Sequence, residues 1–410
     1  MDTNITVYGA YWCPDCRQSK RFLSEHQIAY EWVDIEQDEL AQIYVEKLND
    51  GKRIIPTITF GDGSFLVEPS NAELAKKLGL ATKDPHDFHE VTIIGAGPAG
   101  LTSAIYNARD GFSVMVVDEG ALGGQATTTE NLDNYPGFPD GISGSEWSQR
   151  VVEQAERFGV EFLRAQTVVG LRREHNGIWI KTGDGHEYGS CALLIATGAD
   201  YRRLGVEGEE DYIGAGVHFC STCDGPFYKN RNVAVVGGGY SAAEEALGLL
   251  RFANHVDLLV RSDHLKVSKL VADQVTETEQ ITIRYNTAVT KLVGSDGRLS
   301  GVQIENKETG EAEVLTPDGV FVFIGQQPNT GFLKDSSVLL DDYGFILTGH
   351  NLSQHSEWQR SGHEPEILET SVPGVFAAGD VRVGSTKQVT SAAGEGATAA
   401  LLMRDHLNRT

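Results

Sequence analysis

The first 80 residues alternate between short apolar runs and amphipathic stretches, which predicts a small α/β unit. Runs of β-branched and aromatic residues indicate strands, and apolar residues three and four positions apart indicate helices. Gly61-Asp62-Gly63 is a hairpin signal, and Ser70 with Glu73 forms a capping box at a helix start. The predicted elements are a strand at 5–8, a helix that follows Cys13-Pro14-Asp15-Cys16 and continues to about residue 25, a strand at 30–35, a helix at 38–48, strands at 56–60 and 64–67, and a last helix from residue 70.

This order, βαβαββα, is that of the thioredoxin and glutaredoxin folds. Residues 81–90 are polar and contain a proline, so we interpret them as a connection, with 81–87 as the linker proper. Ten residues span at most about 35 Å. The first unit is therefore tethered close to the rest of the chain.

Two later segments each combine a β-branched strand, a glycine-rich turn and an alanine-rich helix. The strands are predicted at 91–94 and 233–236. The first turn contains Gly95, Gly97, Pro98, Ala99 and Gly100, and the second contains Gly237, Gly238, Gly239, Tyr240 and Ser241. Glycines at this place let main-chain N–H groups and a helix N-terminus meet a pyrophosphate. One such motif is a weak signal, but two in this context predict two dinucleotide sites.

The residues at the end of the next strand distinguish the two sites. Asp118 and Glu119 follow a strand at 114–117, and carboxylates there suit ribose hydroxyls, as in FAD or NAD. Arg261 and Lys266 follow a strand at 255–260, and cations there suit a 2′-phosphate, as in NADP. A solvated basic surface is the alternative interpretation of these two cations. The pattern predicts a flavoprotein that takes hydride from NADPH.

Four of the five cysteines form two C-x-x-C pairs. So few cysteines in a chain of 410 residues do not make a disulfide scaffold, and close pairs are usually catalytic or metal-binding. A single zinc site made by both pairs is disfavoured because about 200 residues separate them. We therefore assign no metal. The pairs are Cys13 with Cys16 and Cys220 with Cys223, and Cys191, in an apolar run, is expected to be buried filler.

Each pair has its own redox-like surroundings. Cys13 precedes a predicted helix N-terminus, which lowers a thiol pKa and makes Cys13 the nucleophile. Pro56 is a candidate cis proline beside this pair, although a strand-start proline would also fit. Asp224 adjoins Cys223, where a carboxylate can give or take the proton that thiol–disulfide chemistry needs.

Charge excludes several functions. Lys and Arg total 34 and Asp and Glu total 58, a net charge of −24, so phosphate backbones and anionic lipids would be repelled. We interpret the acidity as a solubility feature. No apolar run approaches the roughly 18 residues that a membrane span needs, and the N-terminus has no signal-peptide pattern. A cytoplasmic protein is expected.

From residue 88 onward the chain resembles bacterial low-molecular-weight thioredoxin reductases. The residues 95–100 resemble that family's FAD fingerprint, and Cys220-Ser221-Thr222-Cys223-Asp224-Gly225 resembles its redox site, with Ser221 in place of the usual alanine. The resemblance assigns further FAD contacts to Gly124, Gln125, Thr129, Asn134, Ala196, Thr197, Gly198, Gly379, Asp380, Lys387, Gln388 and Val389. It assigns NADPH contacts to Ser262 and Gln326 as well.

Residues 1–80 resemble glutaredoxins, and mycoredoxin-like proteins most closely, through the first cysteine pair, Ile55-Pro56-Thr57 and Gly61-Asp62-Gly63-Ser64. Two departures from the reductase pattern stand out. The family's His-Arg-Arg-x-x-x-Arg motif is replaced by residues 260–266, with one arginine lost and one changed to lysine. Because lysine lacks the planar fork of arginine, we expect NADH to be less well excluded. Residues 349–366 form a polar insertion, interpreted as a solvated surface loop, with a docking loop as the alternative.

The resemblance implies an α/β protein with an N-terminal thioredoxin-like domain at 1–80 and two Rossmann-like domains. The FAD domain would comprise 88–205 and 326–410, and the NADPH domain, 206–325, would be inserted in it. Electrons would pass from NADPH to FAD, to Cys220–Cys223, to Cys13–Cys16 and on to a protein disulfide, such as a thioredoxin- or glutaredoxin-like protein, or to a low-molecular-weight disulfide. Cys223 would lie next to the flavin, Cys220 would attack the outgoing disulfide, Asp224 would be the acid and base, and Cys16 would resolve the mixed disulfide. The family also implies a homodimer and a domain rotation in each cycle.

Two other functions compete with this one. One is a peroxiredoxin reductase like the flavoprotein of alkyl hydroperoxide reductase. That flavoprotein carries two thioredoxin-fold modules in tandem, whereas residues 1–80 of this chain are enough for only one such module. A redox sensor, or a flavoprotein with another donor such as reduced ferredoxin, would be reduced poorly by NADPH. The altered residues at 260–266 are the only support for that alternative, and Asp224 beside an intact pair speaks against a sensor.

Overall fold

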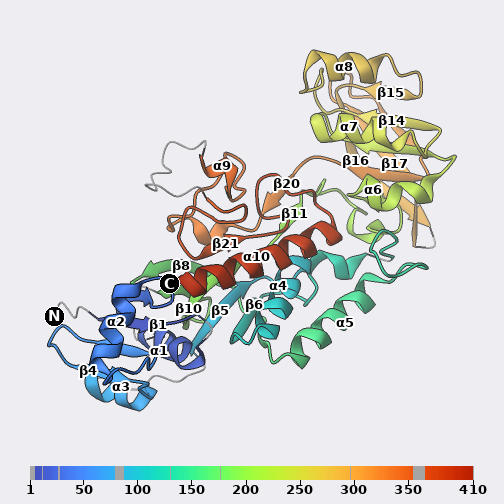
Figure 1. Ribbon diagram of the computed structural model, residues 1–410. Helices are drawn as coiled ribbons and strands as arrows, with labels where there is room; N and C mark the ends of the chain where they lie inside the picture. The colour runs from blue at the N-terminus through green and yellow to red at the C-terminus, as the bar shows by residue number, and fades with distance from the viewer. Residues whose placement is uncertain are drawn as a thin grey trace. The chain divides into compact units, whose positions relative to one another are not determined.

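The computed structural model describes residues 5–11, 13–25, 28–78, 87–129, 131–175, 177–295, 297–353 and 365–409. The chain forms two compact units (Figure 1). The first comprises Met1–Thr127, Ser145–Gly198 and Pro328–Thr410, and the second comprises Thr128–Gly144 and Ala199–Gln327. The α/β class and the Rossmann-like character predicted from the sequence are confirmed. The domain boundaries given above stay a prediction.

The N-terminal part of the first unit has the predicted βαβαββα order. Its sheet has the order β2-β1-β3-β4, with β1 and β2 parallel and the other pairs antiparallel. The Ile55–Pro56 peptide bond is cis, as considered from the sequence. The capping box is also present, because Ser70 N–H donates to Glu73 and Glu73 N–H donates to the Ser70 hydroxyl. The elements are β1 (Thr6–Gly9), α1 (Pro14–Glu25), β2 (Glu31–Asp34), α2 (Glu39–Leu48), β3 (Thr57–Thr59), β4 (Phe65–Val67) and α3 (Asn71–Leu78).

A seven-stranded sheet forms the rest of the first unit. Strands β7, β6, β5 and β10 are parallel neighbours, β9 and β8 continue the sheet as antiparallel strands, and β21 pairs with β10. Its strands are β5 (Phe88–Ile94), β6 (Val114–Asp118), β7 (Glu161–Arg164), β8 (Val168–Glu174), β9 (Gly177–Thr182), β10 (Glu187–Ile195) and β21 (Val375–Ala377). The helices are α4 (Pro98–Arg109), α5 (Gly144–Arg157), α9 (His350–Ser353) and α10 (Val389–Arg409), with short 3₁₀ turns η2 (Gly124–Thr128) and η5 (Gly331–Leu333).

Helices α4 and α10 lie against each other over this sheet (Figure 1). Their approach depends on small residues. A methyl group on Gly396 would lie 2.1 Å from the Ala99 carbonyl oxygen, so only glycine fits there. The close contact buries Ala99, Ala399 and Met403 in one core with the central strands, and it fixes the start of α4 at the carboxyl end of β5.

The second unit is built on a parallel five-stranded sheet of order β12-β19-β13-β14-β15. A three-stranded antiparallel sheet, β16-β17-β18, and the pair β11-β20 complete it. Its strands are β11 (Ala199–Tyr201), β12 (Val217–His218), β13 (Asn232–Val236), β14 (His255–Leu259), β15 (Ile281–Arg284), β16 (Thr287–Ser295), β17 (Arg298–Asn306), β18 (Ala312–Leu315), β19 (Gly319–Val322) and β20 (Gln326–Pro328). Its helices are α6 (Ser221–Asp224), α7 (Tyr240–Leu249) and α8 (Lys269–Thr276), with 3₁₀ turns η3 (Glu210–Tyr212) and η4 (Gly225–Tyr228).

Three expectations from the sequence concern the linker, the polar insertion and Cys191. The predicted linker lies, apart from Asp87, outside the described residues, and so do residues 354–364 of the polar insertion. Cys191 was expected to be buried filler: it does pack against the core, but the expectation of full burial is wrong, because its side chain is only partly buried. Cys191 lines a cavity of about 200 Å³ together with Tyr30 and Trp32, so the core covers only one side of it.

Candidate active site

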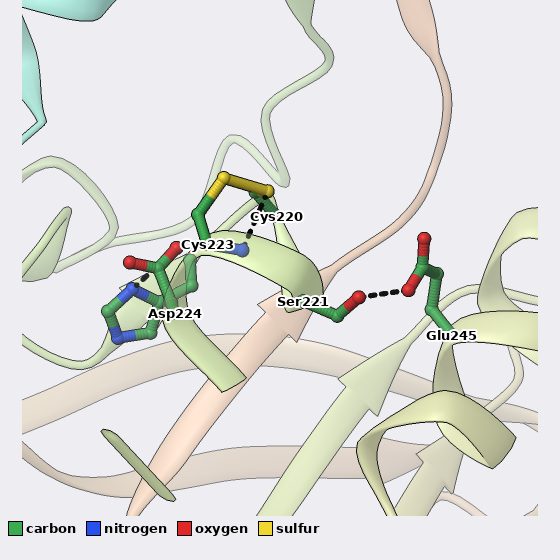
Figure 2. Close-up of a disulfide and its surroundings, with 6 residues drawn as sticks. Cys220, Ser221, Cys223, Asp224 and Glu245 are labelled. Atoms are coloured by element: carbon green, nitrogen blue, oxygen red, sulfur yellow. Dashed lines mark hydrogen bonds and ion pairs between the residues drawn. A yellow bond between two sulfur atoms is a disulfide. The ribbon is translucent and has the colours of Figure 1, made fainter. Parts of the chain in front are cut away.

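Cys220 and Cys223 form a disulfide at the start of helix α6 (Figure 2). Cys220 caps this short helix, and its sulfur accepts a 3.1 Å hydrogen bond from the Cys223 N–H. Both cysteines are partly exposed. A sulfur held at a helix N-terminus is stabilised as a thiolate once the disulfide is reduced. The predicted redox pair is therefore assembled and within reach of a reaction partner.

Asp224 is the carboxylate beside this pair. Its Oδ2 atom lies 3.4 Å from Nδ1 of His218, and Nε2 of His218 lies 2.7 Å from the Tyr228 hydroxyl. His218 is 8% exposed and Tyr228 is 7% exposed. Burial, and then the charge of Asp224, raises the pKa of Tyr228 to about 12, so its hydroxyl stays protonated at neutral pH.

The serine between the cysteines has a partner of its own. The Ser221 hydroxyl donates to a carboxylate oxygen of Glu245 on α7 (Figure 2). Ser221 is buried, and Glu245 is partly buried. The departure from the alanine of the family pattern thus adds a tie between α6 and α7.

The first glycine-rich turn has the geometry of a pyrophosphate cradle. Gly97 caps α4 without a side-chain hydrogen bond, and a methyl group built on it would meet no atom within 4 Å. Gly95 and Gly100 are required for the turn itself, because a methyl group on either would lie within 2.4 Å of a main-chain oxygen. The open space at Gly97 and the uncapped helix start fit a phosphate.

Several predicted FAD residues converge on this turn. A methyl group on Gly95 would meet the Ala196 oxygen, one on Gly124 would lie 3.1 Å from the Cα of Gly97, and one on Gly379 would lie 3.2 Å from Cβ of Ala99. Three segments distant in the sequence therefore meet at the carboxyl ends of β5 and its neighbours, which is where α/β sheets bind ligands. Thr129 and Asn134 belong to the second unit instead.

The acidic residues predicted for FAD have different surroundings. Asp118 accepts N–H groups of Ala96 at 2.5 Å and Gly120 at 2.7 Å, so it braces the turn, whereas Glu119 is exposed. Burial raises the pKa of Asp380, and the nearby Lys387 ammonium, whose own pKa burial lowers, opposes that shift. Lys387 also donates to the main-chain oxygen of Asp380. Thr197 donates to the Asn329 carbonyl at 2.8 Å, which holds the end of β10.

The second glycine-rich turn repeats the cradle at the start of α7. A methyl group on Gly237 would lie 2.4 Å from the Phe323 oxygen, whereas one on Gly239 would meet no atom within 4 Å. Lys266 N–H donates to the Gly238 carbonyl at 2.7 Å, which holds the backbone of this residue at the turn. Arg261 and Lys266 are exposed, and the Ser262 hydroxyl donates to the His264 carbonyl. The Tyr240 hydroxyl accepts the Ser268 N–H at 2.7 Å, and Gln326 opens β20.

The N-terminal cysteine pair is in the thiol form. The Cys13 sulfur accepts the Cys16 N–H at 3.2 Å and lies 3.7 Å from the Ile55 carbonyl oxygen. A hydrogen bond from the Cys16 side chain is the largest influence that lowers the pKa of Cys13 to about 7, while the same bond and burial raise the pKa of Cys16. The lower pKa favours Cys13 over Cys16 as the reactive thiol, and its role as the nucleophile stays a prediction.

Comparison with known proteins agrees with this site. Residues 89–396 match the pyridine nucleotide-disulphide oxidoreductase family, and residues 5–65 match the glutaredoxin family. A thioredoxin reductase of Treponema pallidum is 37% identical over 312 residues, which is 76% of this chain and 95% of that protein. The chain belongs to the thioredoxin reductase family. It is therefore a disulfide oxidoreductase that uses a flavin and a pyridine nucleotide, with an N-terminal glutaredoxin domain.

Solved structures of the family agree as well. The thioredoxin reductase from Streptococcus pyogenes superposes with a TM-score of 0.71 at 36% identity, covering 79% of this chain and 99% of that chain. The thioredoxin reductase from Giardia duodenalis gives a TM-score of 0.70 at 32% identity, covering 78% of this chain and 99% of that chain. Both likenesses cover less than the whole chain, which leaves room for the glutaredoxin domain outside the family's common part.

Sequence reasoning missed His218, Tyr228 and Glu245. One signal was available, because His218 is a polar residue at a buried strand end two positions before Cys220. Within the described ranges, no cluster of three or more His, Cys, Asp or Glu side chains could hold a metal ion. A search of the same residues for a helix that is both long and apolar enough to cross a bilayer found none.

Proposed function

We propose that this chain is a self-contained NADPH-dependent disulfide reductase whose last carrier is its own glutaredoxin domain. The observation that carries the proposal is the presence of two C-x-x-C pairs in one chain of the family. One pair is a disulfide beside Asp224, and the other is a dithiol whose nucleophile has a pKa of about 7. FAD held at residues 95–100 and NADPH held at residues 237–241 would, when bound, supply the electron pair for the Cys220–Cys223 disulfide.

The chain's own residues then carry out two exchanges. Reduced Cys220 attacks the Cys13–Cys16 disulfide, a Cys220–Cys13 bond forms, and Cys16 leaves as a thiolate. Cys223 next attacks Cys220, which restores the Cys220–Cys223 disulfide and frees Cys13. Asp224 takes the proton of the attacking thiol and returns a proton to the leaving thiolate.

The substrate is proposed to be a disulfide of a protein or of a low-molecular-weight thiol. Cys13 attacks it, and Cys16 resolves the mixed disulfide. The family's homodimer is proposed for this chain too. The Cys13–Cys16 disulfide of one subunit could then be reduced by Cys220 of the same subunit or of the partner subunit. The cytoplasm, where thiols are kept reduced, is the compartment that suits a reductase with a free dithiol carrier.

An anaerobic NADPH titration tests this electron path. Flavin absorbance and thiol count should show three two-electron centres: the flavin and two disulfides. The Cys13→Ser/Cys16→Ser double variant should lose one of them, and the Cys220→Ser/Cys223→Ser variant should leave Cys13–Cys16 oxidised. If NADPH reduces only two centres of the native chain, the glutaredoxin domain does not lie in the electron path. If the flavin is never reduced, the NADPH assignment fails and the sensor and other-donor alternatives take its place.

The peroxiredoxin-reductase alternative has less support. The described N-terminal elements form a single four-stranded unit from β1 to β4, not a doubled module. Turnover with a peroxiredoxin together with failure on every small disulfide would favour that alternative.

A further inference from the structure

His218 connects the redox site to a buried hydroxyl. Its ring lies between Asp224 on one side, at 3.4 Å from Nδ1, and the Tyr228 hydroxyl on the other, at 2.7 Å from Nε2. His218 ends β12, Asp224 ends α6 and Tyr228 ends the turn that follows, so all three belong to the second unit. Nothing in the family resemblance assigned a role to His218 or Tyr228.

Packing fixes both rings. Phe321 is fully buried, and its ring centroid lies 5.3 Å from that of His218 and 5.4 Å from that of Tyr228. Gly319 lies directly against the Tyr228 ring, where a methyl group would be 2.4 Å from a ring carbon. The imidazole therefore has little freedom to turn, and its two nitrogens keep their separate partners.

The tautomer of His218 follows from these partners. Because the pKa of Tyr228 is raised to about 12, its hydroxyl keeps its proton and can either donate a hydrogen bond to Nε2 or accept one from it. The Asp224 carboxylate, which can only accept, faces Nδ1 and therefore favours the arrangement in which Tyr228 donates to Nε2. A neutral imidazole that accepts at Nε2 carries its own proton on Nδ1, the nitrogen that faces Asp224. The other charges that act on Tyr228 are those of Arg231, Asp318 and Arg298. Glu245 on α7 accepts a hydrogen bond from Ser221, which lies on α6 together with Asp224.

We propose that His218 is a positioning residue that orients the Asp224 carboxylate by its Nδ1–H and makes Asp224 the proton carrier of the Cys220–Cys223 exchange. In that exchange Asp224 takes the proton of the Cys220 thiol, a Cys220–substrate sulfur bond forms, the substrate disulfide breaks, and the leaving thiolate takes that proton from Asp224. Cys223 then closes the protein disulfide, and the second thiol leaves. Two electrons pass from the dithiol to the substrate, and the two protons come from the Cys220 and Cys223 thiols.

Two disulfides with different leaving groups distinguish this role from a structural one. An alkyl disulfide releases a basic thiolate that needs a proton, whereas an aromatic nitrobenzoate disulfide releases an acidic thiolate that does not. Loss of an oriented proton donor should therefore slow the alkyl reaction selectively. Distortion of the site would slow both reactions to a similar degree.

The experiment uses the full chain with Cys13→Ser and Cys16→Ser, so that only the second pair exchanges. The protein is reduced with dithiothreitol, desalted without oxygen, and mixed in single turnovers with hydroxyethyl disulfide or with the nitrobenzoate disulfide across a range of pH. We expect His218→Phe, which keeps a ring against Phe321, to slow the alkyl reaction about tenfold or more and the aromatic one less than about threefold. His218→Asn, which keeps an N–H donor toward Asp224, should restore most of the alkyl rate.

Three results would overturn the assignment of His218. They are an unchanged alkyl rate in His218→Phe, equal slowing of both disulfides, or a His218→Asn rate as low as that of His218→Phe. A ¹⁵N spectrum of the native protein gives a further check that needs no folded variant, because the signal absent from His218→Asn must show a proton on Nδ1. A proton on Nε2 would contradict the proposal. The inference rests on exchange at Cys220–Cys223, and if the parent protein reduces neither disulfide, the proposed function itself fails.

Discussion

The side-chain nitrogen of Lys20 donates a 2.6 Å hydrogen bond to the main-chain oxygen of Leu407. The two residues lie on α1 and on the last turn of α10, so the bond joins the glutaredoxin domain to the C-terminal helix of the chain. The ammonium group also lies 4.3 Å from the Trp32 ring centroid, and Lys20 is only 7% exposed. The carboxyl end of a helix carries partial negative charge, which suits a cation there.

Burial lowers the pKa of Lys20 to about 8 from its ordinary 10.5. Between these two values the unfolded chain binds more protons than the folded chain, so the Lys20 contribution to stability rises with pH, by up to about 3 kcal/mol. Lys20→Met should remove this dependence. Urea unfolding at about pH 7.5, 9 and 10.5 should show that the free energy of unfolding of the native protein rises with pH relative to that of the variant. If the difference in free energy of unfolding between the two proteins stays constant with pH, the lowered pKa of Lys20 is contradicted.

The nucleophilicity of Cys13 should depend on the Cys16 side chain. Because the Cys16 hydrogen bond is the largest influence that lowers the pKa of Cys13 to about 7, Cys16→Ala should move the midpoint of Cys13 alkylation upward toward the ordinary value of 9. Iodoacetamide labelling of the reduced protein, followed by mass spectrometry of the Cys13 peptide, measures this midpoint. Asp15→Asn is the matched control and should shift it slightly downward, since the Asp15 charge raises the pKa of Cys13.

Two glycine-to-alanine substitutions should have separable effects. Gly239→Ala adds a methyl group to open space at the predicted pyrophosphate cradle, so it should weaken NADPH binding about tenfold or more and leave the melting temperature nearly unchanged. Gly319→Ala places a methyl group into the Tyr228 ring and should lower the free energy of unfolding by about 1–3 kcal/mol. Calorimetry and nucleotide titration of both variants give the comparison. Equal NADPH affinity in Gly239→Ala would remove the cradle assignment.

The Ser221–Glu245 hydrogen bond should be measurable in stability. Ser221→Ala leaves the Glu245 carboxylate without this donor, and we expect a loss of about 1–2 kcal/mol in the free energy of unfolding of the second unit. Glu245→Gln keeps an acceptor oxygen and should cost less than Glu245→Ala. If Ser221→Ala is as stable as the native protein, the hydroxyl contributes nothing to holding α6 on α7.

The elements and both turns could be predicted because their signals are local. The capping box at Ser70, the cis proline at Pro56 and the glycines at 95 and 237 depend on residues a few positions apart. Lys20 and Leu407 are 387 positions apart, and no local sequence pattern predicts their contact. His218 was missed for a similar reason, since its partners are brought to it by the ends of three separate elements. The cavity at Cys191 is likewise lined by Tyr30 and Trp32, which are far away in the sequence.

The short covalent connection changes how strong the Lys20–Leu407 contact needs to be. Only residues 79–87 separate α3 from β5, and a tether of that length gives an effective concentration in the millimolar range. A contact with a dissociation constant of about 1 mM, roughly −4 kcal/mol, is then already formed about half of the time. At ordinary association rates such a contact opens about 10² to 10⁴ times per second, which equals or exceeds most enzymatic turnover numbers. Residence of the glutaredoxin domain on α10 is thus compatible with its leaving that position in every catalytic cycle.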